Sequence, residues 1–281
     1  MKKTKILLTP LFLLLFLFQS CKKEDITTDE NITRKREFER ATFKQAEINL
    51  ITIKAGILAA SIIEKNGYAY RLRANHRMMN CEIVTIDSSS NPYHFTIEFP
   101  NGCTDDEGRP LHGLITGTIT PEFDNPGDFI DIQFVNFEYD NILFNGTARI
   151  DINTKGPGVT TATLNSNLAT TFEFGKYKLD GSNTFYLSGI DDPNNTSLNR
   201  LEFEGGGHGT TGGVSFTQTI TSTLRIPMDD PNCDAEHFIE GEVLFQATGL
   251  PNRVINYGNG QCDNVAFITE NGVTTRFFLD D

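Results

Sequence analysis

The sequence predicts an all-β fold, with antiparallel strands in either a sandwich or an open curved sheet, and one N-terminal helix packed on it. Apolar and polar residues alternate in one segment after another from Cys81 to the C-terminus, as at 94–99, 141–152, 214–224 and 239–247. Turn-forming residues separate these segments, so about a dozen short strands are expected at intervals of about 8–12 residues. Strict alternation gives each strand one buried and one solvated face, which is typical of antiparallel sheets.

Turn dipeptides divide the strands. Asn271-Gly272 lies between two alternating runs and predicts a hairpin. A second Asn-Gly, at 145–146, does not interrupt the alternation of 141–152, so we expect it inside a strand and expect the turn at Asp140-Asn141. The run GGGHGTTGG at 205–213 resembles a phosphate loop in composition. It lies between two strands with no helix after it, so it predicts a flexible hairpin connection.

The helix is expected at about residues 44–65. Ile51, Ala55, Leu58 and Ile62 form one apolar stripe at helical spacing. Asn66-Gly67 follows directly and is a typical helix stop.

The chain divides into three parts. Residues 1–20 have the layout of an export signal, with Lys2, Lys3 and Lys5 before an apolar run of about 13 residues that is too short to span a bilayer. Residues 21–42 are rich in charge of both signs and predict a flexible tether. Residues 43–281 predict one β-rich domain that includes the helix.

Cys21 ends the export signal. A small residue, Ser20, precedes it where a lipoprotein signal would be cleaved, and Phe18 replaces the usual leucine. This pattern resembles lipoprotein signals and implies that Cys21 is acylated. Several acyl chains anchor a protein far more stably than one chain. The next best candidate span, 48–63, fails on both length and charge, because it has 16 residues and contains Lys54.

Four cysteines remain: Cys81, Cys103, Cys233 and Cys262. An even number in an exported chain favours two disulfides, for which three connectivities exist. Short loop closure favours Cys81–Cys103 and Cys233–Cys262. Each pair lies near an aromatic-x-Asn-Gly segment, which either reflects a duplicated half or repeats common turn chemistry.

Two of these cysteines lie in distinctive segments, FPNGCTDDEGRPLHG at 99–113 and RVINYGNGQCDNVAFITENG at 253–272. These segments resemble motifs of uncharacterised Bacteroidota outer-membrane lipoproteins, F-G-x-G-C-T-x-x-x-G-R-x-R-x-G and R-x-I-D-Y-G-x-G-x-C-D-N-x-A. The resemblance extends from about Cys81 to the C-terminus and includes the acylated cysteine, although Leu111-His112 depart from it. It implies an acylated, β-rich envelope protein and supplies no activity or site residue.

The expected location is the outer membrane, with the lipid anchor as the contact to the membrane. Lys23-Glu24-Asp25 resembles a signal that displays such lipoproteins on the cell surface; the alternative is the periplasmic face. A net charge of -13 disfavours nucleic acid as a partner. A protein or glycan partner cannot be named from the sequence.

No catalytic motif is present, so the sequence gives no positive indication of an enzyme, and no cofactor is expected. The five histidines lack metal-ligand spacing, and the acidic turns lack the calcium-loop pattern, so no metal site is predicted. We therefore expect a binding or structural module. The alternatives are a carbohydrate-binding or glycan-processing lipoprotein, or a carrier of an apolar ligand.

Overall fold

A computed structural model gives the fold of the protein. It describes residues 32–36, 38–40, 42, 48, 51–52, 55–56, 81–105, 108–121, 123, 125–156, 159–173, 175–188, 200–227, 233 and 237–279. The signal segment, Cys21, Leu58, Ile62 and Asn66-Gly67 lie outside these residues.

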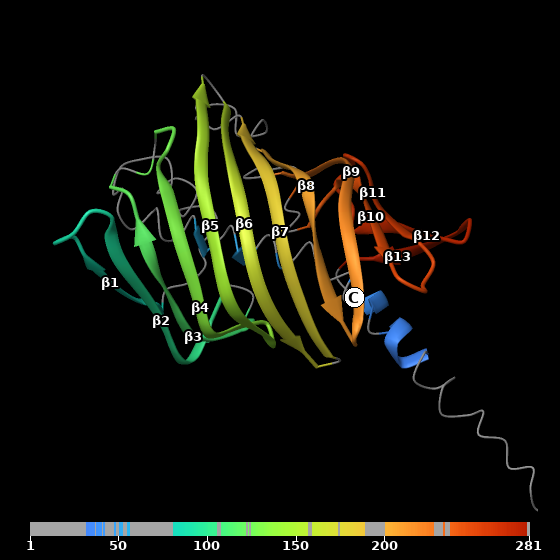
Figure 1. Cartoon of the computed structure of the whole chain (residues 1–281), viewed down its shortest axis with the longest axis horizontal. Helices are drawn as coiled ribbons and strands as arrows, with labels where there is room; N and C mark the ends of the chain where they lie inside the picture. Colours follow the sequence, from blue (N-terminus) through green and yellow to red (C-terminus); the bar gives the residue numbers. More distant parts are fainter. Residues whose placement is uncertain are drawn as a thin grey trace, which may run out of the picture.

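All thirteen described strands belong to one antiparallel sheet, in which every strand pairs with the next one along the chain. The sheet is open and curved (Figure 1), so the curved-sheet form of the prediction is confirmed. The strands are β1 (Ile83–Asp87), β2 (Tyr93–Thr104), β3 (Pro110–Ile119), β4 (Phe129–Tyr139), β5 (Ile142–Gly156), β6 (Val159–Phe172), β7 (Gly175–Ser188), β8 (Arg200–Thr211), β9 (Val214–Pro227), β10 (Glu240–Ala247), β11 (Arg253–Asn259), β12 (Val265–Glu270) and β13 (Val273–Phe278).

The predicted turns are confirmed. Asp140 and Asn141 join β4 to β5 with φ angles of 49° and 62°, and Asn271 and Gly272 join β12 to β13 with 51° and 76°. Two successive positive φ angles match the twist of paired strands, which is why Asn and Gly are preferred there. Asn145-Gly146 lies inside β5, as its unbroken alternation indicated.

Described helical residues lie against one face of the sheet, which we call the inner face; the opposite face is the outer face (Figure 1). Residues 32–36, 38–40, 42, 48, 51–52 and 55–56 are helical, and Ile48, Ile51 and Ala55 are buried in the core. A Cβ placed on Gly56 would lie 3.5 Å from Ile132 Cδ1 and even closer to Ile150 Cδ1. This glycine therefore allows the helix to approach β4 and β5 closely.

Helical structure begins earlier than the sequence analysis predicted. Residues 32–40, assigned to a flexible tether, are helical where described, and Phe38 is buried against Phe216 with ring centroids 6.0 Å apart. The tether prediction was wrong here because it relied on average composition. Two individual residues in this segment, Phe38 and Thr42, are buried in the folded protein. Among the described helices, none is long and apolar enough to cross a membrane.

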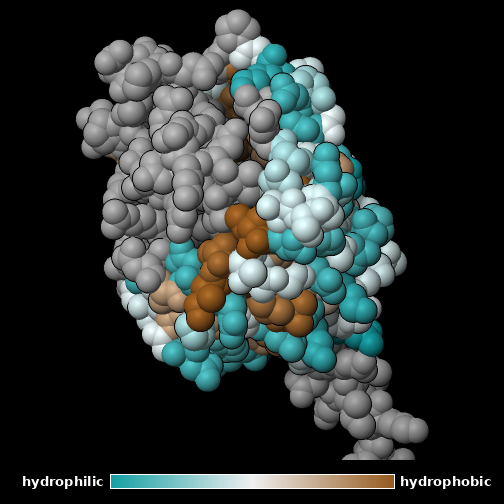
Figure 2. Space-filling view, turned by 90° about the vertical axis from the view of Figure 1, so that its left-hand side faces the viewer, coloured by the Kyte–Doolittle hydropathy of each residue, from teal (hydrophilic) through white to brown (hydrophobic). Residues whose placement is uncertain are grey.

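The inner face forms the core, which is rich in phenylalanine. Phe134, Phe137 and Phe144 pack against one another with ring centroids 5.7–5.9 Å apart, and Tyr177 packs on Phe216 at 5.3 Å. Tilted aromatic pairs at such distances add to the stabilisation from area burial. At the β1 edge, some hydrophobic side chains remain at the surface (Figure 2), and Ile83 is 54% exposed.

Two disulfides each close one hairpin, and the two hairpins lie toward opposite ends of the sheet. Cys81–Cys103 closes the β1–β2 hairpin and Cys233–Cys262 closes the β10–β11 hairpin, with Cα atoms 5.7 and 5.4 Å apart. This is the connectivity that loop closure favours. Both bonds restrict the unfolded chain at strands far from the sheet centre.

Candidate functional site: a polar groove on the outer face

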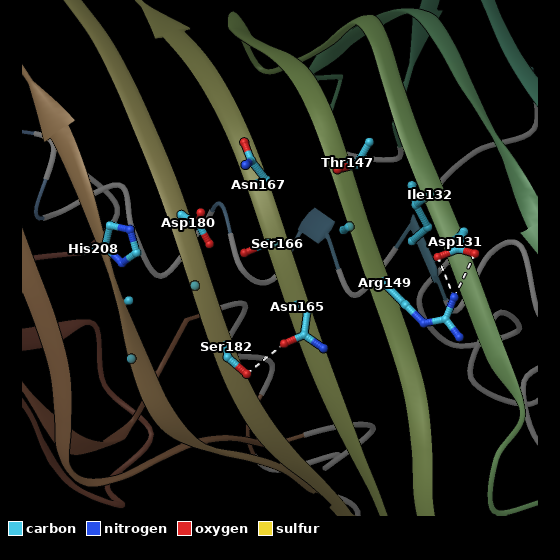
Figure 3. A pocket seen from close by; sticks show the side chains of 14 residues that line it. Asp131, Ile132, Thr147, Arg149, Asn165, Ser166, Asn167, Asp180, Ser182 and His208 are labelled. Atoms are coloured by element: carbon cyan, nitrogen blue, oxygen red, sulfur yellow. Dashed lines mark hydrogen bonds and ion pairs between the residues drawn. The ribbon is translucent and has the colours of Figure 1, made fainter.

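Two adjoining hollows form a groove across the outer face of β4–β10. The first has a volume of about 720 Å³ and the second about 790 Å³, and they share Asn167, Asp180 and His208. Figure 3 shows the first hollow. The lining side chains that point outward are mostly amides, hydroxyls and charged groups. The groove therefore offers hydrogen bonds to a ligand at the solvated side of the sheet.

Strand register aligns these side chains in a row. Direct cross-strand partners run without a break through Thr147 on β5, Asn167 on β6, Asp180 on β7, His208 on β8, Thr217 on β9 and Gln246 on β10. All six residues line the groove and all six are exposed. We call these residues the polar row. The same register continues through Gln133, Thr116 and Thr96 to Thr85 on β1.

Glycines form the floor of the groove at β7 and β8. Gly181, Gly206 and Gly207 line the first hollow and Gly209 lines the second. A Cβ on Gly206 would clash with the backbone carbonyl oxygen of Gln218, so the close approach of β8 to β9 requires glycine there. Residues 205–211 thus lie inside β8, and the predicted flexible connection was wrong: the turn contains only Gly212 and Gly213. Composition favoured a loop, but pairing on both sides holds the run extended.

A second row beside the polar row contains an ion pair. Arg149 donates to both carboxylate oxygens of Asp131 at 3.0 and 2.9 Å and to Asp151 at 2.8 Å, and its guanidinium lies 3.9 Å from the ring centroid of Phe129. Partial burial alone would lower the pKa of Arg149, but Asp151 and Asp131 raise it above its usual value. Asn165 accepts from Ser182 Oγ at 2.8 Å in the same row. Internal bonds therefore occupy much of this row.

The polar row itself keeps its hydrogen-bonding capacity. Asn167, Asp180 and His208 have no side-chain hydrogen bond or ion pair within the described part of the chain. An amide and a neutral imidazole each offer donor and acceptor atoms, and a carboxylate accepts only. These three side chains at the centre of the groove are therefore available to a ligand.

The geometry gives little support to glycan hydrolysis at this groove. The groove carboxylates are Asp131 on β4 and Asp180 on β7, and strands are spaced by about 4.8 Å, so their backbones are about 14 Å apart. Glycosidases place their two carboxyl groups about 5–10 Å apart. Asp131 is also engaged by Arg149.

The motif residues that carry the family resemblance have structural contacts. Asp105 bonds to Arg109 and accepts from Tyr139 Oη at 3.0 Å, and these bonds lower its pKa although burial opposes the shift. Arg253, 6% exposed, bonds to Glu39 and Glu270 at 3.2 Å. The first motif thus closes the β2–β3 connection, and the second fixes the N-terminal helix to β11 and β12.

Three buried polar side chains interrupt the apolar inner face behind the groove. Ser166, Asn183 and Gln218 are 4%, 1% and 4% exposed, and Ser166 Oγ, both amide atoms of Asn183 and Gln218 Oε1 have no partner within the described residues. They lie on β6, β7 and β9; Ser166 and Asn183 are close to Gly181, and the backbone carbonyl of Gln218 is close to Gly206. Unpaired buried polar groups destabilise the native state.

Several predicted features lie apart from the groove. Lipidation at Cys21 falls outside the described residues, and the four disulfide cysteines are at the two ends of the sheet. The groove itself was not predicted. Its only signals in the sequence were the alternate polar positions of the strands and the run GGGHG, and these acquire meaning only through register. Among the described residues, no cluster of three or more His, Cys, Asp or Glu could hold a metal ion.

Comparison with known proteins adds no relative. The chain matches no protein-family model, no curated protein and no solved structure.

Proposed function

We propose that this protein is a lipid-anchored carbohydrate-binding module of the outer membrane, displayed on the cell surface. The observation that carries the binding role is the polar row, in which Asn167, Asp180 and His208, at the junction of the two hollows, have no side-chain partner among the residues that the structure describes. Sugar hydroxyls both donate and accept hydrogen bonds, and this row offers both kinds of partner. The residues before and after Cys21 support the anchor and the display.

The polar row suits this role because its side chains are exposed and lie outside the buried core. Side chains of the row are exposed, and surface substitutions of this kind usually change stability by less than about 0.5 kcal/mol. A loss of binding in such variants can therefore be assigned to lost contacts. Thr96→Ala is a matched control, because Thr96 lies in the same register on β2, outside both hollows.

One experiment on intact cells tests location and binding together. Cells producing the full chain with a C-terminal tag are expected to bind a fluorescent neutral glycan, and external protease should remove both the tag and the binding. Asn167→Ala combined with His208→Ala should reduce binding about tenfold, since each net hydrogen bond is worth about 0.5–1.5 kcal/mol.

The outcomes separate the two parts of the proposal. A tag that resists external protease while permeabilised cells lose it would show that display is wrong. Equal binding by the double variant and by Thr96→Ala would show that the groove is not the site.

A further inference from the structure

We infer that the groove binds a linear, uncharged glycan chain that lies across the strands and occupies both hollows at once. This inference rests on the proposed function and names the ligand class for the same site. It follows from the shape, the charge and the side chains of the groove.

The groove is longer across the strands than along them. Its lining takes at most five successive residues from one strand, as in residues 178–182 and 206–210, which extends about 14 Å at about 3.4 Å per residue. Across the sheet it runs from β4 to β10, which is about 29 Å at about 4.8 Å per strand. An extended ligand that fills both hollows therefore runs perpendicular to the strands.

The polar row follows this long direction. Thr147 and Gln246 are its ends, five strand spacings or about 24 Å apart, and the four residues between them present a hydrogen-bonding group at each strand. A regular ladder of such groups matches a ligand with regularly repeated hydroxyls. A compact ligand would contact only one of the two hollows.

Local charge selects an uncharged chain. The groove lining contains two carboxylates, Asp131 and Asp180, and two cations, Arg149 and Lys178, so its formal charge is balanced although the whole chain carries -13. An anionic polymer would meet no excess of cations in the groove and would be repelled by the protein as a whole. A cationic polymer would find Asp131 already paired with Arg149.

Affinity should grow with chain length. Among the described residues that line the groove, the one aromatic residue is Phe216, which is 3% exposed on the inner face, so these residues provide no stacking platform. Binding then relies on hydrogen bonds, which contribute little individually. Many contacts along the row are needed, and these accumulate only with a long chain.

The test uses the detergent-solubilised full chain and titration calorimetry. The probes are β-1,4-glucan, α-1,4-glucan and β-1,4-mannan, each from the monosaccharide to long oligomers, with polygalacturonate as an acidic comparison. For at least one neutral series, affinity should rise with length and level off once the oligomer spans the row. Thr147→Ala and Gln246→Ala, at opposite ends, should each weaken the longest oligomer about threefold to tenfold, whereas Thr96→Ala should have no effect.

Three results would overturn the inference: no neutral series binds, affinity does not increase with length, or polygalacturonate binds more tightly than every neutral oligomer. The effect of His208→Ala distinguishes a failure of this inference from a failure of the proposed function. If His208→Ala weakens a short or acidic glycan, the site stands and the linear neutral ligand is wrong. If neutral oligomers bind and His208→Ala has no effect, the proposed site itself is wrong.

Discussion

The two faces of the central strands differ although one backbone forms both. On β9, Phe216 is 3% exposed and packs between the aromatic rings of Phe38, Tyr177 and Phe245, whereas the next residue, Thr217, is exposed in the polar row. The inner side chains are fixed by mutual contact. The side chains of the polar row are exposed, so their substitution should change stability little and they are accessible to a ligand.

Adjacent substitutions on β9 should show the largest contrast. Phe216→Ala removes a buried ring and is expected to destabilise the protein by about 3–5 kcal/mol. Thr217→Ala, one residue away on the outer face, should change stability by less than about 0.5 kcal/mol. Urea unfolding of both variants measures this difference, and comparable losses would contradict the assignment of the two faces.

The polar residue Asn183 lies on the otherwise apolar inner face. Its replacement should change the free energy of unfolding less than Phe216→Ala does, and in the opposite direction. Replacing it with leucine, which has a similar shape, removes two buried amide atoms that have no partner in the described part of the chain. We expect a gain in unfolding free energy of about 1–3 kcal/mol. Thermal and urea unfolding provide the measurement, with Asn165→Leu on the outer face as a control without such a gain. Destabilisation by Asn183→Leu would show that the amide is hydrogen-bonded in solution.

The smallest expected effect on stability concerns ion pairs at the end of β12, where charged groups rather than apolar side chains pack together. Burial alone would raise the pKa of Glu270, but Lys35 and Arg253 lower it below its usual value. The folded pKa is thus below the unfolded one, so this stabilisation is present above about pH 4.3 and is lost as pH falls through the folded pKa. Glu270→Gln should cost about 0.5–1 kcal/mol at pH 7.

Unfolding free energies from pH 7 to strongly acidic pH measure this dependence. The difference between the parent protein and Glu270→Gln should shrink as Glu270 is protonated. Glu98→Gln, at an exposed position on β2, is the comparison variant for the loss of a carboxylate outside this cluster. A difference that stays constant over the whole range would exclude the ionised carboxylate as its cause.

Local chemistry explains which parts of the fold could be predicted. Alternation identified the β class, and the Asp140-Asn141 and Asn271-Gly272 turns follow from the backbone angles that these residues tolerate. The early helix was missed because its contacts form only in the folded chain, which places Phe38 against Phe216 and Glu39 against Arg253. The glycine run of β8 was misassigned because its extended form depends on β7 and β9 on either side.

The sequence by itself determined the strand class, the turn positions and the favoured cysteine pairing, and it predicts the lipid anchor at Cys21. Each of these depends on neighbouring residues or on short loop closure. Tertiary structure decided that the strands form one open sheet and that Thr147, Asn167, Asp180, His208, Thr217 and Gln246 stand in one row. These residues come from six strands, and only cross-strand hydrogen bonding fixes the register that aligns them.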